Sequence, residues 1–244
     1  MRALITAGGR GTRLRPLTHT SNKHLIPIAN KPMIHYALEA VAAAGIQEVG
    51  IAINPDTGDD TPIFEAVHAI RPSARGELEI SDVHQYLLEH DYQVGFSEIT
   101  GWWKDTGKFE DLLEANRFAL DHLLDEVGPV VRGFVDAESD VQGKVVVEAG
   151  ARVIASHIRG PAIIGADCVV ERSYVGPFTS LGPRCVIRDS ELEYSILFED
   201  TQILDADVRI ERSLLGREVL IRRAAGRPKT QRFILADQSI IELC

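Results

Sequence analysis

Residues 135–187 read VDAESDVQGKVVVEAGARVIASHIRGPAIIGADCVVERSYVGPFTSLGPRCVI, and one pattern repeats throughout this stretch. A large aliphatic residue recurs every six positions, apart from two five-residue steps, at Val135, Val141, Val147, Val153, Ile158, Ile164, Val170, Val175, Leu181 and Ile187. A hexapeptide period is typical of a parallel β-helix, in which each coil buries its apolar face against its neighbours. We therefore predict a β-helix over residues 130–244, with weaker repeats at Ile210, Leu215 and Ile221 and a closing segment at its end.

The fifth residue of each hexad is predicted to fill a narrow interior corner. Most of these residues are small, and the full set is Ser139, Val145, Ala151, His157, Ala162, Cys168, Tyr174, Thr179, Cys185 and Glu191. Cys168 and Cys185 lie three hexads apart, so they should stack on adjacent coils. Together with Cys244 they are few, odd in number and far apart, which predicts free thiols in a reducing compartment.

The N-terminal half alternates strand-like and helix-like segments. Strands are predicted at Ala3–Ala7, Val49–Ile53 and Tyr92–Ile99, and helices at Pro32–Ala44, Ile63–Ile70, Ser81–His90 and Lys108–Leu124. Two short apolar strands joined by a helix form a βαβ unit, which requires a parallel sheet. The sequence thus predicts an α/β domain over residues 1–125, followed by the β-helix.

Charge is distributed unevenly along the chain. The 244 residues include 26 basic and 36 acidic side chains, giving a net charge of −10, yet residues 1–38 hold six Lys or Arg and no Asp or Glu. A local cationic segment in an acidic protein favours a polyphosphate ligand over nucleic acid. The chain lacks an apolar run long enough for a bilayer span or a signal peptide, so we expect no membrane partner and a cytoplasmic location.

The cationic segment contains a glycine-rich stretch, Gly8-Gly9-Arg10-Gly11-Thr12-Arg13-Leu14-Arg15-Pro16-Leu17-Thr18, directly after the first predicted strand. A strand that runs into a glycine-rich turn can present backbone N–H groups to a phosphate. The composition and the pattern together predict a phosphate site at the start of the chain.

Three stretches resemble motifs of the sugar-1-phosphate nucleotidyltransferases: Gly8–Met33, Arg75–Asp82 (RGELEISD) and Gly101–Gly107 (GWWKDTG). Over nearly its whole length the chain is most similar to bacterial glucose-1-phosphate thymidylyltransferases that carry a C-terminal left-handed β-helix. The resemblance implies a Rossmann-like nucleotidyltransferase domain before that β-helix. It also implies a reaction in which glucose 1-phosphate attacks the α-phosphorus of dTTP, giving dTDP-glucose and pyrophosphate.

The resemblance also implies roles for single residues. Gly8, Gly9 and Gly11 would let the backbone approach the triphosphate, while Thr12 and Arg13 would contact its phosphates. Lys23 would hold the sugar phosphate or the α-phosphate, so Arg13 and Lys23 are the expected catalytic residues. Glu77 would lie on the sugar side of the site, and Asp105 would be one of two carboxylates that bind Mg²⁺.

The chain departs from the family pattern near residues 60–61. The loop after the second strand passes directly into a segment that resembles a much later part of the family domain. The intervening part would carry the other metal carboxylate and the contacts to the base and the sugar. The sequence therefore predicts a truncated domain that retains triphosphate binding and has impaired turnover. The exposed edges of its short sheet must pair differently, associate with another copy as a homo-oligomer, or be poorly ordered, and we expect a homo-oligomer.

Each assignment has a simpler alternative. The glycines could form only a tight turn, and the basic side chains could be solvated surface charges, namely Arg10, Arg15, Lys23 and Lys31. Trp102 and Trp103 could serve packing. Glu77 and Asp82 could be a charge pair at a helix N-terminus, and Asp105 could cap the helix that begins near Lys108. Two other functions remain open. One is a non-catalytic nucleotide-binding or assembly protein built on the β-helix, and the other is an acyltransferase in the β-helix with His157 as its base.

Overall fold

The computed structural model describes residues 2–8, 11–19, 21–52, 62–74, 78–94, 104–127, 130–225 and 239–242. The chain divides into two compact units. The first comprises Met1–Arg10 with Ile34–Trp103, and the second comprises Gly11–Met33 with Lys104–Cys244. The segment from Gly11 to Met33 thus groups with the β-helix, whereas the sequence-based boundaries assign it to a domain that ends at residue 125.

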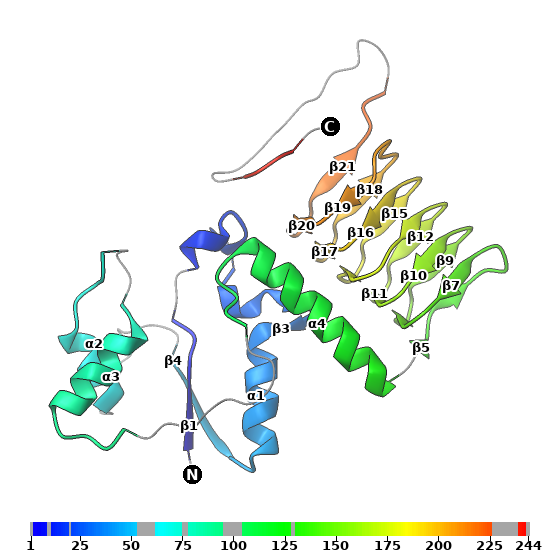
Figure 1. The fold of residues 1–244 in the computed structure, drawn as a ribbon. Helices are drawn as coiled ribbons and strands as arrows, with labels where there is room; N and C mark the ends of the chain where they lie inside the picture. The colour runs from blue at the N-terminus through cyan, green and yellow to red at the C-terminus, as the bar shows by residue number, and fades with distance from the viewer. Residues whose placement is uncertain are drawn as a thin grey trace. The chain divides into compact units, whose positions relative to one another are not determined.

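The first unit contains the predicted βαβ arrangement. Strand β1 (Arg2–Thr6) pairs in parallel with β4 (Glu48–Ala52), and helix α1 (Met33–Ala43) connects them (Figure 1). Among the described residues this sheet has only two strands. Its apolar side chains are partly open to solvent, with Leu4 37% and Ile51 43% exposed, in line with the short sheet that the sequence predicts.

Two further helices in the first unit pack on each other. Helix α2 (Pro62–Ala69) and helix α3 (Ile80–Glu89) enclose a small core of Ala66, Val83 and Leu87. Both helices lie where the sequence predicts them. The strand predicted at Tyr92–Ile99 is wrong for residues 92–94, which are irregular, and the remainder of it lies outside the described residues.

The C-terminal half is a parallel β-helix with three faces over residues 130–222, as predicted (Figure 1). The first face contains β5 (Val130–Val131), β8 (Val145–Val147), β11 (Ala162–Ile164), β14 (Thr179–Leu181), β17 (Ile196–Leu197) and β20 (Leu214–Leu215). The second contains β6 (Phe134–Val135), β9 (Arg152–Ile154), β12 (Val169–Glu171), β15 (Val186–Arg188), β18 (Gln202–Leu204) and β21 (Leu220–Arg222). The third contains β7 (Asp140–Gln142), β10 (His157–Arg159), β13 (Tyr174–Val175), β16 (Glu191–Glu193) and β19 (Ile210–Glu211).

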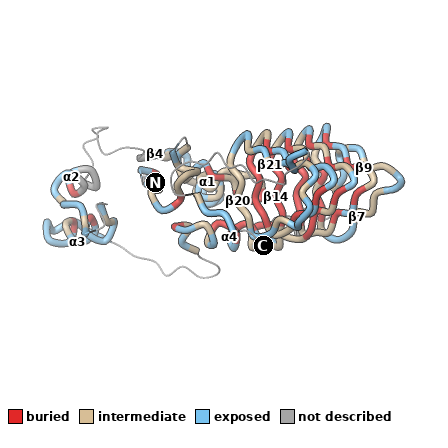
Figure 2. The backbone as a smooth tube through the Cα atoms, turned by 90° about the horizontal axis from the view of Figure 1, so that it is seen from above, coloured by how far each residue is buried: buried red, intermediate tan, exposed pale blue. Residues whose placement is uncertain are grey.

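The hexad aliphatics form the core of the β-helix in the predicted register. Val147, Ile164 and Leu181 pair across adjacent coils, and Figure 2 shows buried residues recurring from coil to coil along the β-helix. The weaker repeats at Ile210, Leu215 and Ile221 also pack against this core, as predicted. In the predicted closing segment, Phe233–Leu235 lies outside the described residues, while Ile240 and Ile241 are exposed.

The interior-corner prediction is wrong on one of the three faces. His157 and Glu191 are exposed and Tyr174 is half-buried. In a six-residue step the fifth residue lies two positions before the next aliphatic and shares its inward direction. In a five-residue step it lies only one position before, so the alternation along the strand turns it outward.

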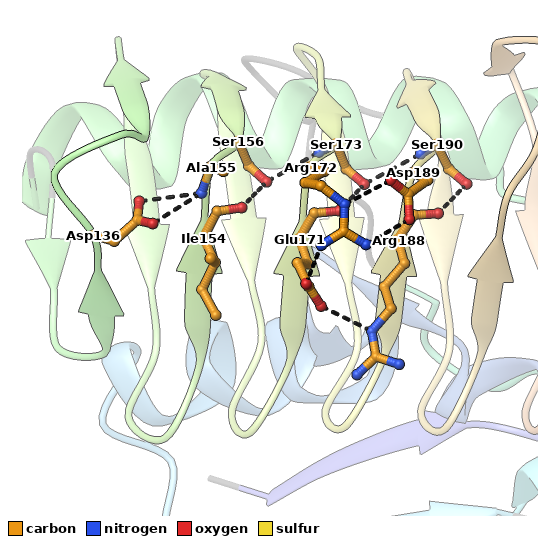
Figure 3. A network of polar contacts seen from close by, with 10 residues as sticks. All are labelled: Asp136, Ile154, Ala155, Ser156, Glu171, Arg172, Ser173, Arg188, Asp189 and Ser190. Atoms are coloured by element: carbon orange, nitrogen blue, oxygen red, sulfur yellow. Dashed lines mark hydrogen bonds and ion pairs between the residues drawn. The ribbon is translucent and has the colours of Figure 1, made fainter.

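Serines take the interior position at that corner instead. Ser156, Ser173 and Ser190 are buried and form a ladder across adjacent coils (Figure 3). The Ser173 hydroxyl donates to the Glu171 carbonyl at 2.7 Å and accepts the N–H of Ser190 at 3.2 Å. Ser156 makes the equivalent contacts with Ile154 and Ser173. Each hydroxyl therefore gives a buried N–H on the next coil its acceptor, and it adds a second donor to a carbonyl that already accepts a backbone N–H.

The two stacked cysteines are confirmed as buried free thiols. Cys168 donates its S–H to the Gly182 carbonyl and Cys185 to the Phe198 carbonyl, each at 3.0 Å. A hydrogen bond with Cys185, and then burial, raise the pKa of the Cys168 thiol. Both thiols serve as small interior side chains.

The second unit also contains the segment that leads from the glycine-rich loop. Three short 3₁₀ turns, η1 (Thr12–Leu14), η2 (Leu17–His19) and η3 (Lys23–Leu25), precede an antiparallel hairpin of β2 (Pro27–Ile28) and β3 (Lys31–Pro32). Helix α4 (Phe109–Val127) contacts both β2 and β14 (Figure 1). No helix among the described residues is long and apolar enough to cross a bilayer.

Candidate functional site

Gly11 is the glycine of the loop whose conformation the fold requires. Its φ is +61°, in the left-handed region that favours glycine. A Cβ there would lie 2.9 Å from the Thr18 side chain and 3.0 Å from Lys23 Cβ. The Thr18 hydroxyl also donates to the Gly11 carbonyl at 2.7 Å. Gly11 thus brings the stem of Lys23 against the loop backbone, which a larger residue would prevent.

The two residues after Gly11 open the first 3₁₀ turn. Thr12 is half-buried and Arg13 is exposed, while Leu14 is buried and anchors the turn. Gly8 is exposed and belongs to the first unit. Gly9 lies outside the described residues. Within the second unit, the turn leaves the Arg13 guanidinium available to solvent and to ligands.

Arg13 and Asp105 meet at Gly107. A Cβ built on Gly107 would lie 3.2 Å from Asp105 Oδ2 and 3.3 Å from the central guanidinium carbon of Arg13. Gly107 itself is buried, whereas both charged side chains are exposed. Two of the predicted site residues, far apart in sequence, therefore border one point in the second unit, and the absence of a side chain at Gly107 makes this possible.

Helix α4 holds the segment that carries Asp105. Lys104 Nζ lies 3.1 Å from Asp111 Oδ1 and 2.5 Å from Glu114 Oε2, and hydrogen bonds to Glu114 and then Asp111 raise the pKa of Lys104. The N–H of Lys108 donates to Asp111 Oδ2 at 3.1 Å. Asp111, three residues after Lys108, thus makes the contact of a capping box at the start of α4.

Helix α4 also holds the hairpin that follows Lys23. The N–H of Ala29 donates to Asn116 Oδ1 at 2.8 Å, and the Asn30 amide donates to the Leu181 carbonyl at 2.6 Å. The sequence-based site did not include Asn116. A signal was present, because Asn116 lies on the same helix face as Leu112 and Leu120, and a polar residue in an apolar stripe needs buried hydrogen-bond partners.

Other predicted residues are not described. Glu77, Trp102 and Trp103 lie outside the described residues, so their roles stay predictions. Across the part of the chain that is described, no group of three or more His, Cys, Asp or Glu side chains is arranged to hold a metal ion by itself.

A shallow hollow of about 550 Å³ lies on the β-helix beside His157, the acyltransferase candidate. Both arginines that line it are paired with carboxylates of the same hollow. Arg172 forms an ion pair with Asp189 at 2.7 Å (Figure 3), and Arg209 forms one with Glu191 at 2.8 Å. These ion pairs offer little unmatched charge for an anionic acyl carrier.

Comparison with known proteins identifies relatives along the whole chain. It is 34% identical to a glucose-1-phosphate thymidylyltransferase of Streptomyces antibioticus, in an alignment that covers 100% of this chain and 99% of the relative. A glucose-1-phosphate thymidylyltransferase of Streptomyces griseus is also 34% identical, with 98% of each chain covered. The low-salt glycan biosynthesis nucleotidyltransferase Agl11 of Haloferax volcanii is 27% identical, with full coverage of both chains.

The same comparisons bear on the predicted join. The alignment with the Streptomyces antibioticus protein runs over 359 columns against 244 residues of this chain, so about 115 columns face a gap here. The profile of the nucleotidyl transferase family matches in two pieces, residues 2–62 and residues 59–122. The two pieces meet near residues 60–61, where the sequence passes directly into a segment that resembles a later part of the family domain.

Proposed function

The chain belongs to the sugar-1-phosphate nucleotidyltransferase family, and from this premise we propose that it binds dTTP and glucose 1-phosphate and catalyses nucleotidyl transfer between them at a strongly reduced rate. The proposal assigns triphosphate binding to Gly8, Gly9, Gly11, Thr12 and Arg13, and catalytic roles to Arg13 and Lys23. The observation that carries it is the approach of Arg13 and Asp105 to one point at Gly107.

Each side chain has a defined task in this reaction. The phosphate oxygen of the sugar attacks the α-phosphorus, and pyrophosphate leaves with the electrons of the broken P–O bond. The Arg13 guanidinium would neutralise the charge that builds up on the leaving pyrophosphate. Lys23, whose stem packs against Gly11, would hold the attacked phosphate or the attacking one in place.

Asp105 fits a role in holding Mg²⁺. Mg²⁺ is bound by oxygen and is often held by one or two carboxylates together with the phosphates of the substrate. The cradle at Gly107 keeps the Asp105 carboxylate open beside a cation, Arg13, which would contact the same polyphosphate. A bound Mg²⁺ would neutralise negative charge on the phosphate oxygens.

The gap near residues 60–61 supports the reduced rate. We take the roughly 115 alignment columns that face a gap to lie at this join, because the family profile matches in two pieces that meet near residues 59–62. By resemblance, that part supplies the second metal carboxylate and the contacts to the base and the sugar. We accordingly propose two modules, residues 1–125 with a join near 60–61 and residues 130–244, of which the first retains mainly its phosphate-binding part.

Calorimetric titration of dTTP with Mg²⁺ tests the binding half of the proposal. We expect the Arg13→Ala and Lys23→Ala variants each to raise Kd about tenfold or more, because each removes a charge-assisted phosphate contact. Arg152→Ala is the matched control, since Arg152 is an exposed arginine on the β-helix. Equal Kd values for the wild type and both site variants would contradict the assignment.

Pyrophosphate release tests the catalytic half. With dTTP, glucose 1-phosphate and Mg²⁺ we expect turnover far below the roughly 1–10³ s⁻¹ of typical enzymes. Turnover within that range would refute the impairment. Binding of dTTP with no turnover at all would favour the alternative, a non-catalytic nucleotide-binding or assembly protein.

The proposal extends to self-association and location. The exposed Leu4 and Ile51 side chains on a two-stranded sheet favour homo-oligomers, and the family chemistry suits the cytoplasm, where nucleoside triphosphates occur. Sedimentation equilibrium should show a mass above the 26.9 kDa of one chain. A monomer at all concentrations would overturn this part alone.

A further inference from the structure

One side chain joins three elements of the second unit. Asn116, on helix α4, is 0% exposed, and its Oδ1 accepts the N–H of Ala29 and the hydroxyl of Ser180, each at 2.8 Å. Its Nδ2 donates to the carbonyl of Phe178 at 3.1 Å. Ala29 is at the tip of the β2–β3 hairpin, and Phe178 and Ser180 flank the start of β14. The amide thus connects the hairpin to the β-helix through α4.

The hairpin tip requires such a support. Ala29 and Asn30 both have left-handed backbones, with φ of +47° and +59°, a conformation unfavourable for alanine. The Asn116 oxygen holds the first of these residues, and the Asn30 amide, bonded to the Leu181 carbonyl, holds the second. Two buried or half-buried hydrogen bonds therefore fix the hairpin against β14.

The hairpin is connected to Lys23 by a short series of backbone hydrogen bonds. The N–H of Met33 donates to the Ile26 carbonyl at 3.1 Å and closes the hairpin. The N–H of Ile26 donates to the Lys23 carbonyl at 3.2 Å, and Ile26 is fully buried. The backbone of Lys23 is consequently fixed from the side of α4, while its side-chain stem packs against Gly11.

We infer that Asn116 is a positioning residue for Lys23, and that it makes the β-helix part of the phosphate site through the hairpin tip. This inference rests on the proposed function, because it takes Lys23 as a phosphate contact. Asparagine suits the position because one side chain accepts two hydrogen bonds and donates one. Alanine would leave the Ala29 N–H, the Ser180 hydroxyl and the Phe178 carbonyl without these partners.

A double-mutant cycle on dTTP binding with Mg²⁺ tests the connection. We expect Asn116→Ala to raise Kd about fivefold and Lys23→Ala about tenfold. The double variant should stay within about twofold of Lys23→Ala, because a residue that acts through Lys23 has nothing to position once the lysine is gone. A Kd for the double variant about fiftyfold above that of the wild type, which is the product of the two single effects, would overturn the inference.

Two further variants separate positioning from general damage. Asn30→Gly keeps the left-handed backbone and removes only the contact with Leu181, so it should raise Kd about twofold to threefold with normal thermal unfolding. Ser173→Ala is the matched control, since it deletes a buried hydrogen-bonding side chain elsewhere in the β-helix. The inference is wrong if Ser173→Ala weakens dTTP binding as much as Asn116→Ala does.

Amide hydrogen exchange provides a readout that does not depend on the proposed function. In Asn116→Ala we expect faster exchange in residues 26–33 and unchanged exchange in β12 and β15. Failure of the wild type to bind dTTP would refute the proposed function, and exchange would still report on the hairpin. Unchanged exchange in residues 26–33 of Asn116→Ala would refute the positioning role itself.

Discussion

At the scale of single residues, the missing side chain of Gly107 leaves space between the charged groups of Asp105 and Arg13. Gly107 is buried, and the space that its Cβ would occupy is bordered by the Asp105 carboxylate and the Arg13 guanidinium. These contacts, at 3.2 and 3.3 Å, are tighter than ordinary van der Waals distances, so any side chain there must displace one of the two groups.

Gly107→Ala should therefore weaken binding of dTTP with Mg²⁺ by roughly threefold to tenfold and leave the unfolding midpoint of the β-helix unchanged. Calorimetry and denaturant titration measure the two quantities. Gly50→Ala is a matched control, because a Cβ at Gly50 would crowd only Leu4, at 3.1 Å. A Kd equal to that of the wild type would show that the cradle plays no part in binding.

Some of the candidate site residues are predictable from the sequence, and others are not. Arg13, Lys23 and Asp105 can be proposed from the sequence because they lie in stretches that resemble motifs of the family. Asn116 and Gly107 were missed because their roles depend on contacts between segments far apart in sequence. The polar interruption of an apolar helix stripe marks a residue such as Asn116 as buried and bonded, but does not identify its partner.

At the scale of elements, the serine ladder stabilises one corner of the β-helix (Figure 3). Replacing Ser173 by alanine leaves the buried N–H of Ser190 and the carbonyl of Glu171 without this partner. We expect Ser173→Ala to lower the free energy of unfolding by about 1–3 kcal/mol, measured by urea titration. Ser213→Ala, which removes the same bond to the i−2 carbonyl at an exposed position, should cost much less.

Ion pairs along the outside of the coils make the stability of the β-helix depend on pH. Hydrogen bonds from Arg172 lower the pKa of Asp189, and those from Arg184 lower the pKa of Asp200. A carboxyl group whose pKa is lower in the folded state stabilises the fold at pH values above its unfolded pKa of about 3.9. This stabilisation is lost as the pH falls through the pKa of the folded state.

As the pH is lowered from about 5 to about 2, the urea concentration at the unfolding midpoint of the wild type should accordingly decrease. The midpoint of the Asp189→Asn variant should decrease less steeply. The two proteins should converge at the acid end, where the wild-type carboxyl group is protonated too. The difference at neutral pH should be small and should shrink in about 1 M salt, because both partners are exposed. A difference that stays constant with pH would contradict this account.

Element types were largely predictable, and their exceptions have physical causes. The hexad period identified the strands, because each coil repeats the same burial. The prediction that the fifth residue faces inward fails at His157 and Tyr174. In a five-residue step this residue lies one position before the next aliphatic, so the alternation of side chains along the strand turns it outward. The β2–β3 hairpin was missed, since its strands are two residues long and bounded by Pro27 and Pro32.

At the scale of the whole molecule, the two units differ greatly in their described cores. Only Ala66, Val83 and Leu87 form the buried cluster of α2 and α3, whereas sixteen buried side chains, from Val145 to Ile203, form that of the β-helix. Since burial of apolar surface provides most of the stability, the units should not unfold together.

Hydrogen exchange should show this as two populations. We expect backbone amides of α2, α3 and β4 to exchange at least about a hundredfold faster than those of β12 and β15, and denaturant titration to show two transitions. A single transition with uniform protection would indicate one cooperative unit. The grouping of residues 11–33 with the β-helix predicts that η3 and the hairpin follow the slower population.

The coil register described above also governs how such a chain can change length. From Val147 to Ile164 to Leu181, each coil advances the chain by the same interval of 17 residues. Beyond β14 the interval is 16 residues from Leu181 to Leu197 and 18 residues from Leu197 to Leu215, yet all three side chains keep their inward direction, so the corners between strands absorb small changes in coil length. Single-residue insertions should therefore be tolerated at the corners and not within a strand, where they would reverse the facing of the side chains, and duplication of a whole coil should preserve the stacking.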